Sequence, residues 1–161
     1  MKYFAILTVL ILIVTLVGVG YMYMTANIFV DAVGVVATDA PSQIALFEEL
    51  REQVRLGAVL GTPYIPAQEL ADAENYQFYT YTVRLKNNCF VTADMVEVQV
   101  TPMQGDVLQL ADEAARALPA RTTGDLGATI LTDINMHSVR ELNISYYMWG
   151  IPFTIRTAYG H

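Results

Sequence analysis

Two histidines and one cysteine are the residues that nucleophilic or acid–base catalysis would use first. His137 lies in a polar turn, Asp133 to Ser138, His161 lies at the end of the sequence, and neither stands in a recognisable nucleophile motif. A Ser, His, Asp triad needs a histidine beside a nucleophile and a third group that orients it. The sequence therefore predicts no catalytic residue and a protein that is not an enzyme. A hydrolase with an unrecognised site remains a rarer alternative.

Soft and borderline metal ligands are present but scattered. Cys89, seven methionines and two histidines could bind copper or zinc, yet no second cysteine lies near Cys89. The acidic pairs Glu48-Glu49 and Asp112-Glu113 occupy adjacent positions that point in different directions on a helix, and no calcium loop with alternating acids occurs. No Gly-rich phosphate loop is present either. We expect no metal site and no cofactor.

Aromatic residues gather near the C-terminal end of the sequence. Tyr and Trp are enriched where proteins recognise partners, because each offers a large apolar body with one polar group. Alternation along a strand turns about half of these residues inward. The candidate partner surface consists of Tyr147, Trp149, Phe153 and Tyr159.

The stretch from Tyr3 to Ala26 carries no charged residue, and its centre is almost entirely Ile, Leu and Val. A helix needs about 20 apolar residues to cross a membrane, so this stretch predicts a transmembrane signal-anchor. Lys2 is the only charged side chain on the short side, which predicts a cytoplasmic N-terminus and an extracellular C-terminal domain in a single-pass protein of the cell membrane. The alternative is a signal peptide cleaved near Gly20, which would release the same domain as a secreted form.

The 135 residues from Asn27 to His161 match the commonest size of one domain, so we expect a single extracytoplasmic domain there. They carry 16 acidic and 8 basic residues, a balance that disfavours nucleic acid and a second membrane contact. Cys89 is the only cysteine and forms no internal disulfide. We expect it in an accessible loop, and a homodimer bridged through it stays open.

Periodicity predicts the elements of this domain. The residues near 43 to 56 form a helix with an apolar face, a cap at Ser42 and a stop at Gly57. The segment from Ala111 to Leu118 is either a short helix or a loop, and Gly61 to Glu74 reads as a loop. The predicted strands are 27–39, 76–86, 95–101, 105–110, 126–132, 139–149 and 153–159, and the last two form a hairpin.

About seven short strands with turn residues between them predict a mainly β fold, an immunoglobulin-like antiparallel β-sandwich with the helix inserted after its first strand. Apolar residues that alternate along the strands form the expected core. These residues are Tyr79, Tyr81, Val83, Leu85, Val96, Val98, Val100, Ile130, Leu142, Ile144 and Tyr146.

Three motifs carry a family resemblance. The segments Val83 to Asn88, Ala93 to Val98 and Leu118 to Ala120 resemble bacterial extracellular sandwich modules related to the CARDB and NEW3 adhesion-type domains. The segment Tyr146 to Phe153 is similar to one near the end of small uncharacterised membrane-anchored proteins of Gram-positive bacteria. The resemblance implies a non-enzymatic module of the cell envelope.

The sequence thus predicts a membrane-anchored extracytoplasmic interaction or scaffold protein. Its expected partner is a membrane or cell-envelope protein, because no flexible Gly/Ser linker separates the apolar stretch from the first strand and the domain has little reach. Exposed sheet edges and the aromatic hairpin are the expected contact surfaces. The alternative is a ligand-binding module for cell-wall glycan or a metal.

Overall fold

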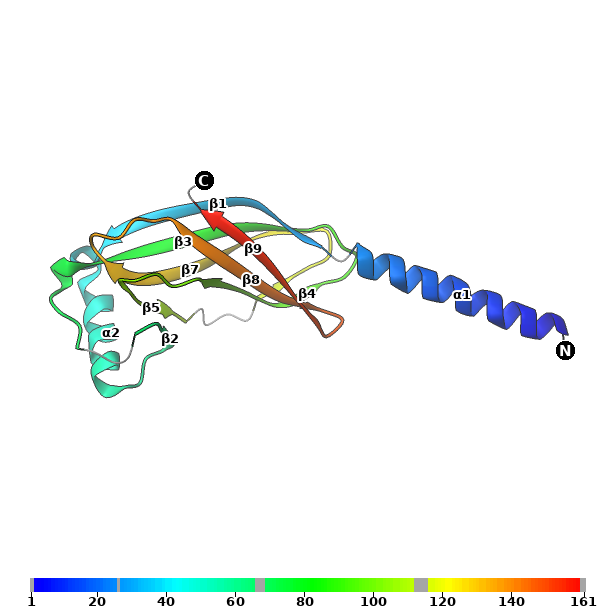
Figure 1. The fold of residues 1–161 in the computed structure, drawn as a ribbon, viewed down its shortest axis with the longest axis horizontal. Helices are drawn as coiled ribbons and strands as arrows, with labels where there is room; N and C mark the ends of the chain where they lie inside the picture. Colours follow the sequence, from blue (N-terminus) through cyan, green and yellow to red (C-terminus); the bar gives the residue numbers. More distant parts are fainter. Residues whose placement is uncertain (1, 26, 66–68, 112–115, 160–161) are drawn as a thin grey trace.

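The computed structural model describes residues 2–25, 27–65, 69–111 and 116–159. Its first element is α1 (Lys2–Met24), a 23-residue helix with no buried side chain that extends away from the rest of the chain (Figure 1). Its length and composition suit a membrane span, and they equally suit a signal sequence near the N-terminus. The apolar helix expected over Tyr3 to Ala26 is thereby confirmed from Tyr3 to Met24; Ala26 lies outside the described residues.

Among the described residues, nine strands form two antiparallel sheets, so the prediction of a mainly β fold with two packed layers is confirmed. The first sheet has the order β1 (Ile28–Asp39), β3 (Tyr76–Asn87), β7 (Thr123–Asp133), β5 (Asp106–Leu110), β2 (Gly61–Pro63). The second has the order β6 (Arg116–Leu118), β4 (Ala93–Val100), β8 (Arg140–Met148), β9 (Ile151–Tyr159). The sequence predicted about seven strands because β2 and β6 have three residues each, too few for alternation to be recognised.

The core between the sheets forms as alternation along the strands predicted. In β3, for example, Tyr81, Val83 and Leu85 are fully buried, while the side chains between them are exposed. All eleven predicted core residues belong to this cluster. The two sheets therefore hold together through apolar contact, without a disulfide among the described residues.

A second apolar cluster lies on the other face of the five-stranded sheet. Helix α2 (Ile44–Leu56) buries Phe47, Leu50 and Val54 there, against Phe78 of β3 and Leu131 of β7. The amphipathic pattern predicted the helix and its buried side, but it does not say which face of a sheet the helix covers. One end of this sheet is consequently buried on both faces.

The ends of α2 follow the prediction at one terminus only. Gly57 has a φ of 66° and donates its backbone N–H to the carbonyls of Gln53 and Val54, so the predicted C-terminal stop is confirmed. The cap predicted at Ser42 is wrong, because a 3₁₀ turn, η1 (Ala40–Gln43), precedes the helix and Gln43 occupies the N-cap without a side-chain hydrogen bond. Pro41 favours this turn, since its fixed φ suits the first helical positions.

Two segments differ from their sequence interpretation. Part of Ala111 to Leu118 is a strand, β6, rather than a helix; residues 112–115 lie outside the described residues. The expected loop Gly61 to Glu74 begins with strand β2 and runs into a short 3₁₀ turn, η2 (Ala73–Asn75). Both strands owe their conformation to pairing with β4 and β5, which local sequence does not encode.

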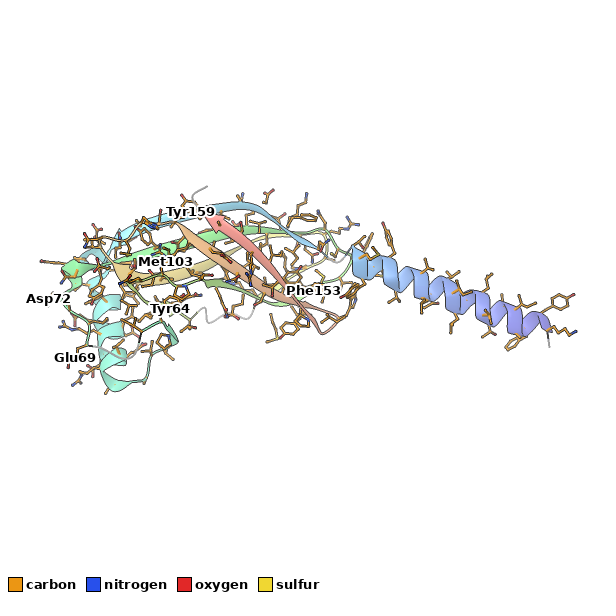
Figure 2. The ribbon with its side chains drawn as sticks, in the orientation of Figure 1. Tyr64, Glu69, Asp72, Met103, Phe153 and Tyr159 are labelled. Carbon is orange, nitrogen blue, oxygen red and sulfur yellow. The ribbon has the colours of Figure 1, made fainter. Side chains whose placement is uncertain are left out.

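The molecule has two unlike ends. Helix α1 joins the sandwich at one end, and α2 covers the other (Figure 1). Phe153 lies near α1, whereas Glu69 and Asp72 lie at the end near α2 (Figure 2). We call them the proximal end, beside α1, and the distal end, beside α2.

Candidate functional site

The β8–β9 hairpin carries the aromatic residues that the sequence proposed as a partner surface. Met148 pairs with Ile151, so the turn consists of two residues, Trp149 and Gly150, with φ values of 53° and 75°. Positive φ at both central residues is typical of a type I′ turn, whose backbone twist matches that of antiparallel strands. The predicted hairpin is confirmed, and its β9 strand includes Ile151 and Pro152, which the sequence placed in the turn.

The structure places the four proposed residues in two environments. Tyr147 and Trp149 are exposed. Phe153 is half-buried and stacks on the buried ring of Tyr146, with ring centroids 5.5 Å apart and planes at 11°. Tyr159 is also half-buried and meets the ring of Tyr81 edge-on at 6.3 Å. Tyr147 and Trp149 are therefore free for a partner, while Phe153 and Tyr159 stabilise the hairpin against the core.

The same hairpin contacts the end of α1. The ring of Tyr23 lies 6.0 Å from that of Phe153, and the hydroxyl of Tyr146 lies 3.5 Å from the backbone nitrogen of Ile28. The thiol of Cys89 donates to the carbonyl of Thr25 at 3.2 Å. Helix α1 is thus fixed to the proximal end by an aromatic contact and by two polar contacts at its exit.

Cys89 corrects one expectation. It lies between β3 and β4 as predicted, but only 6% of it is exposed, because it packs into the core beside the α1 exit. Its backbone N–H donates to the side chain of Asn87, whose amide in turn donates to the carbonyls of Val91, Leu118 and Pro119. The expectation of an accessible thiol is therefore wrong, and the bridge that the sequence left open would require this loop to unfold.

The potential catalytic and metal-binding residues are not brought together. His137 is exposed in the loop before β8, and His161 lies outside the described residues. Within the described ranges, no three His, Cys, Asp or Glu residues are placed to hold a metal ion. Glu48 and Glu49 are exposed on α2, where Glu48 pairs with Arg51 at 3.6 Å.

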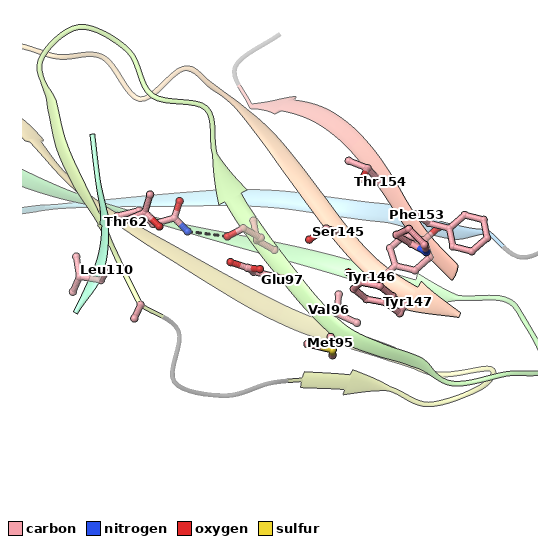
Figure 3. Close-up of a pocket in the computed structure, with 15 residues that line it drawn as sticks. Thr62, Met95, Val96, Glu97, Leu110, Ser145, Tyr146, Tyr147, Phe153 and Thr154 are labelled. Carbon is pink, nitrogen blue, oxygen red and sulfur yellow. Dashed lines mark hydrogen bonds between the residues drawn. The ribbon is translucent and has the colours of Figure 1, made fainter. Parts of the chain in front are cut away.

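A groove crosses the side of the sandwich near this hairpin. It has a volume of about 570 Å³ and is lined by parts of β2, β4, β5, β8 and β9 (Figure 3). Its walls carry the Tyr147 ring and the polar side chains of Glu97, Ser145 and Thr154. An aromatic face beside hydroxyls and a carboxylate is chemistry that suits a sugar.

A buried ion pair at the distal end joins the two sheets. Arg140 of β8 donates from Nη2 and Nε to the carboxylate of Asp106 of β5, at 2.7 and 3.0 Å, and both side chains are fully buried. Nη1 of Arg140 donates to the carbonyls of His137 and Val139. Burial lowers the pKa of Arg140, but the hydrogen bonds and charge of Asp106 outweigh it and the pKa is raised. The guanidinium therefore stays charged.

Tyrosines near this pair hold their protons strongly. Burial raises the pKa of Tyr81 to about 12, and its hydroxyl donates to the carbonyl of Ser138 at 2.8 Å. Burial likewise raises the pKa of Tyr64 well above its ordinary value. Sequence alone missed this polar cluster, since neither Asp106 nor Arg140 stands in a motif and their segments are 34 residues apart.

The side chain of Gln109 closes one edge of the four-stranded sheet. Its Oε1 accepts from the Val100 N–H at 2.8 Å, and its Nε2 donates to the Val98 carbonyl at 2.9 Å. These are the backbone groups that a neighbouring strand would use, and β6 reaches only Ala93 and Val96 of β4. Gln109 thereby takes the place of a strand along the rest of this edge.

No family model matches the chain, and no curated protein matches it.

Proposed function

We propose that this protein is a non-enzymatic, membrane-anchored interaction or scaffold module of the cell envelope. In this proposal α1 spans the membrane with its N-terminal end in the cytoplasm, and the sandwich lies outside and holds a partner protein close to the bilayer. The length and apolar composition of α1 support the span, and the positive charge of Lys2 at its short side supports the orientation.

The joint between α1 and the sandwich is the observation that carries the proposal. Helix α1 ends at Met24 and β1 begins at Ile28, so a connection of three residues, 25–27, separates the apolar helix from the sandwich. The Tyr23–Phe153 and Cys89–Thr25 contacts hold the joint on two sides. A module held in this way meets partners in the same membrane more readily than distant ones.

We further propose that the sandwich is an immunoglobulin-like module. The order β1-β3-β7-β5 in one sheet and β4-β8-β9 in the other supports this assignment, because immunoglobulin domains divide seven strands into groups of four and three in this way. Because a fold does not by itself imply a function, the proposed binding role rests on the exposed surfaces of this sandwich.

Strand β1 is the edge that we propose for the partner. It is 12 residues long, ends its sheet, and carries Asp31 and Asp39 as its only charged residues. No described strand pairs with its outer side, and a bulge near Asp31 is its only irregularity. Long edge strands that lack lysine and proline pair readily with another strand, whereas β9, the other long edge, contains Pro152 and Arg156.

Site-specific photocrosslinking of the full-length protein in its native membrane tests this proposal. A crosslinker at Val36, an exposed position of β1, should capture one specific membrane or envelope protein. The same group at Glu49, on the exposed side of α2, serves as the matched control. Equal capture at both positions, or no specific product at Val36, would count against a partner at β1.

Two alternatives remain distinguishable. The groove beside Tyr147 favours a binding module for cell-wall glycan, which isothermal titration of the full chain with wall glycan fragments would detect, and the variant Tyr147→Ala should then lose the binding. A secreted form would appear as a loss of the first 20 or so residues in the intact mass of the protein isolated from cells. Either result would count against the proposal of a membrane-anchored scaffold.

A further inference from the structure

We infer that the proximal end of the sandwich is itself a membrane-contacting surface, which rests in the headgroup and upper acyl region of the bilayer that α1 crosses. This inference rests on the proposed membrane span. The surface consists of the β8–β9 turn with Trp149 and Ile151, the loop before β4 with Phe90, and Met95 at the start of β4; we call it the proximal tip.

The proximal tip exposes large apolar side chains from segments that are distant in sequence. Phe90 is 72% exposed, Met95 64% and Trp149 45%, although each has a large apolar area that water solvates poorly. Full burial of one such side chain contributes about 1.5–3 kcal/mol. Exposed apolar side chains gathered at one end of a domain are typical of an interaction site.

Contacts with α1 place this surface beside the membrane. Phe90 follows Cys89, whose thiol contacts the carbonyl of Thr25, and the turn with Trp149 caps the hairpin in which Phe153 contacts Tyr23. In Figure 1 the β8–β9 turn and the loop before β4 both lie at the end from which α1 emerges. A span that enters the bilayer at Tyr23 therefore brings the tip to the interface, where Trp and Tyr side chains prefer to lie.

The backbone of the proximal end gives a second, independent observation. The non-glycine residues with positive φ in the described chain are Met95, Arg121 and Trp149, and all three lie at this end. Such conformations cost of order 1–3 kcal/mol when the residue is neither Gly nor Asn. The first position of a type I′ turn favours Asn strongly, so Trp149 is not the residue that stability alone would select there.

Charge is distributed in agreement with this orientation. From Asp39 to Glu74, a segment that includes α2 at the distal end, the sequence has seven acidic and two basic residues. At the proximal end the guanidinium of Arg121 lies 4.1 Å from the centre of the Phe90 ring, and Lys86 is exposed near the start of β1. Asp94, opposite Tyr147, and Asp31 of β1 are exposed carboxylates near this end, and Asp125 pairs with Arg84 at 2.8 Å. The net acidity that disfavoured a second membrane contact therefore belongs largely to the far end.

Trp149 is the only tryptophan of the chain and reports directly on the environment of the tip. The uncleaved full-length protein is reconstituted into phosphatidylcholine–phosphatidylglycerol vesicles, with lipids brominated near the headgroup or deep in the acyl chain. We expect the headgroup-proximal bromines to quench the Trp149 emission by roughly half or more, because the indole should lie at the interface. Aqueous acrylamide should quench it several-fold less than free tryptophan.

A chain that carries Trp149→Tyr together with Leu56→Trp is the matched control, since Leu56 is exposed at the end of α2. Its single tryptophan should respond to acrylamide and not to brominated lipid. Equal acrylamide quenching of Trp149 and Trp at position 56 would overturn the inference. Protection of Trp149 from both quenchers would also overturn it, because a second copy of the chain would then cover the tip. Cleavage of α1 in cells, measured as intact mass, would refute the proposed anchor without affecting this result.

Discussion

The two ends of the sandwich use similar residues for opposite purposes. At the distal end α2 covers the sheet, the Arg140–Asp106 pair is completely buried, and Phe47 and Phe78 are packed inside. At the proximal end Phe90 and Trp149 are exposed, and the turns contain non-glycine residues with positive φ. The distal end also leaves Ile44, Leu56 and Leu60 exposed, so exposed apolar area alone does not separate the two ends. The difference is that folding buries charged and aromatic groups at the distal end, whereas the exposed apolar side chains of the proximal end lie beside α1.

The largest effect should come from breaking the distal ion pair. Arg140→Met leaves the carboxylate of Asp106 buried without its cation, which should lower the free energy of unfolding by about 3–5 kcal/mol. Urea unfolding of the full chain in a non-ionic detergent, followed by circular dichroism, measures this. Arg84→Met, which removes the exposed partner of Asp125, should cost less than about 1 kcal/mol. Equal losses in the two variants would show that burial does not make the Arg140–Asp106 pair more important to stability than the exposed Arg84–Asp125 pair.

The double variant Asp106→Leu with Arg140→Met sharpens this result. Apolar side chains of similar volume often replace a buried ion pair without loss of stability, so we expect the double variant to recover most of what Arg140→Met loses. A further loss in the double variant would mean that the Asp106 carboxylate stabilises the fold through another contact, the hydrogen bond that it accepts from the Met103 N–H at 2.8 Å.

The next largest effect concerns the helix that covers the distal sheet. Leu50→Ala leaves a cavity between α2 and the five-stranded sheet, which should lower the free energy of unfolding by about 2–4 kcal/mol. Ile44→Ala, half-exposed on the same helix, should change it by less than about 1 kcal/mol. If both substitutions had the same small effect, α2 would be a loosely attached segment, and the contrast between the two ends would weaken.

Alkaline pH should weaken the interior around the ion pair. Burial raises the pKa of Tyr81 to about 12 from an ordinary value of 10, so the folded state favours the neutral phenol. The stabilisation by the neutral Tyr81 phenol is complete below pH about 10 and is lost as the pH rises through about 12. The free energy of unfolding should fall by about 2–3 kcal/mol over this range. Urea unfolding between pH 9 and 12 should show this fall. Tyr81→Phe should make the fall of the free energy of unfolding with pH shallower. An unchanged dependence on pH would contradict a raised pKa of Tyr81 as its cause.

The smallest effect should have the opposite sign. Trp149→Asn places a residue that tolerates positive φ in the β8–β9 turn, so it should raise the free energy of unfolding by about 0.5–1 kcal/mol. Gly150→Ala in the same turn, where φ is 75°, should lower it by about 1 kcal/mol. Thermal unfolding followed by circular dichroism distinguishes the two. A clear loss of stability in Trp149→Asn would show that Trp149 supports the sandwich and is not spare surface.

Alternation along the strands predicted much of this fold. Tyr81, Val83 and Leu85 in β3 were recognisable as core because the side-chain period of a strand is two and both sheets bury one face. The length of the apolar stretch predicted the helix α1, and Gly150 between two alternating segments predicted the β8–β9 hairpin. Strands β2 and β6 were not, because three residues contain no period.

The candidate site was predictable only in part. The aromatic composition of β8 and β9 pointed to the hairpin, but alternation could not tell that Phe153 packs inward on Tyr146 and Tyr23 while Trp149 points into solvent. Burial of Cys89 was missed because it arises from packing into the core beside the α1 exit, where the thiol contacts Thr25, more than 60 residues earlier in the chain. Loop position indicates exposure only when nothing packs on the loop.

The sequence by itself determined the apolar helix, the seven longer strands and the residues of the core between the sheets, because hydrophobicity and its period are local properties. The tertiary structure alone decided which end of the sandwich adjoins the apolar helix, that Arg140 finds Asp106 across the two sheets, and that Phe90 and Trp149 share the end from which that helix leaves. These features depend on which distant segments contact one another in the folded protein. A local sequence pattern does not contain that information.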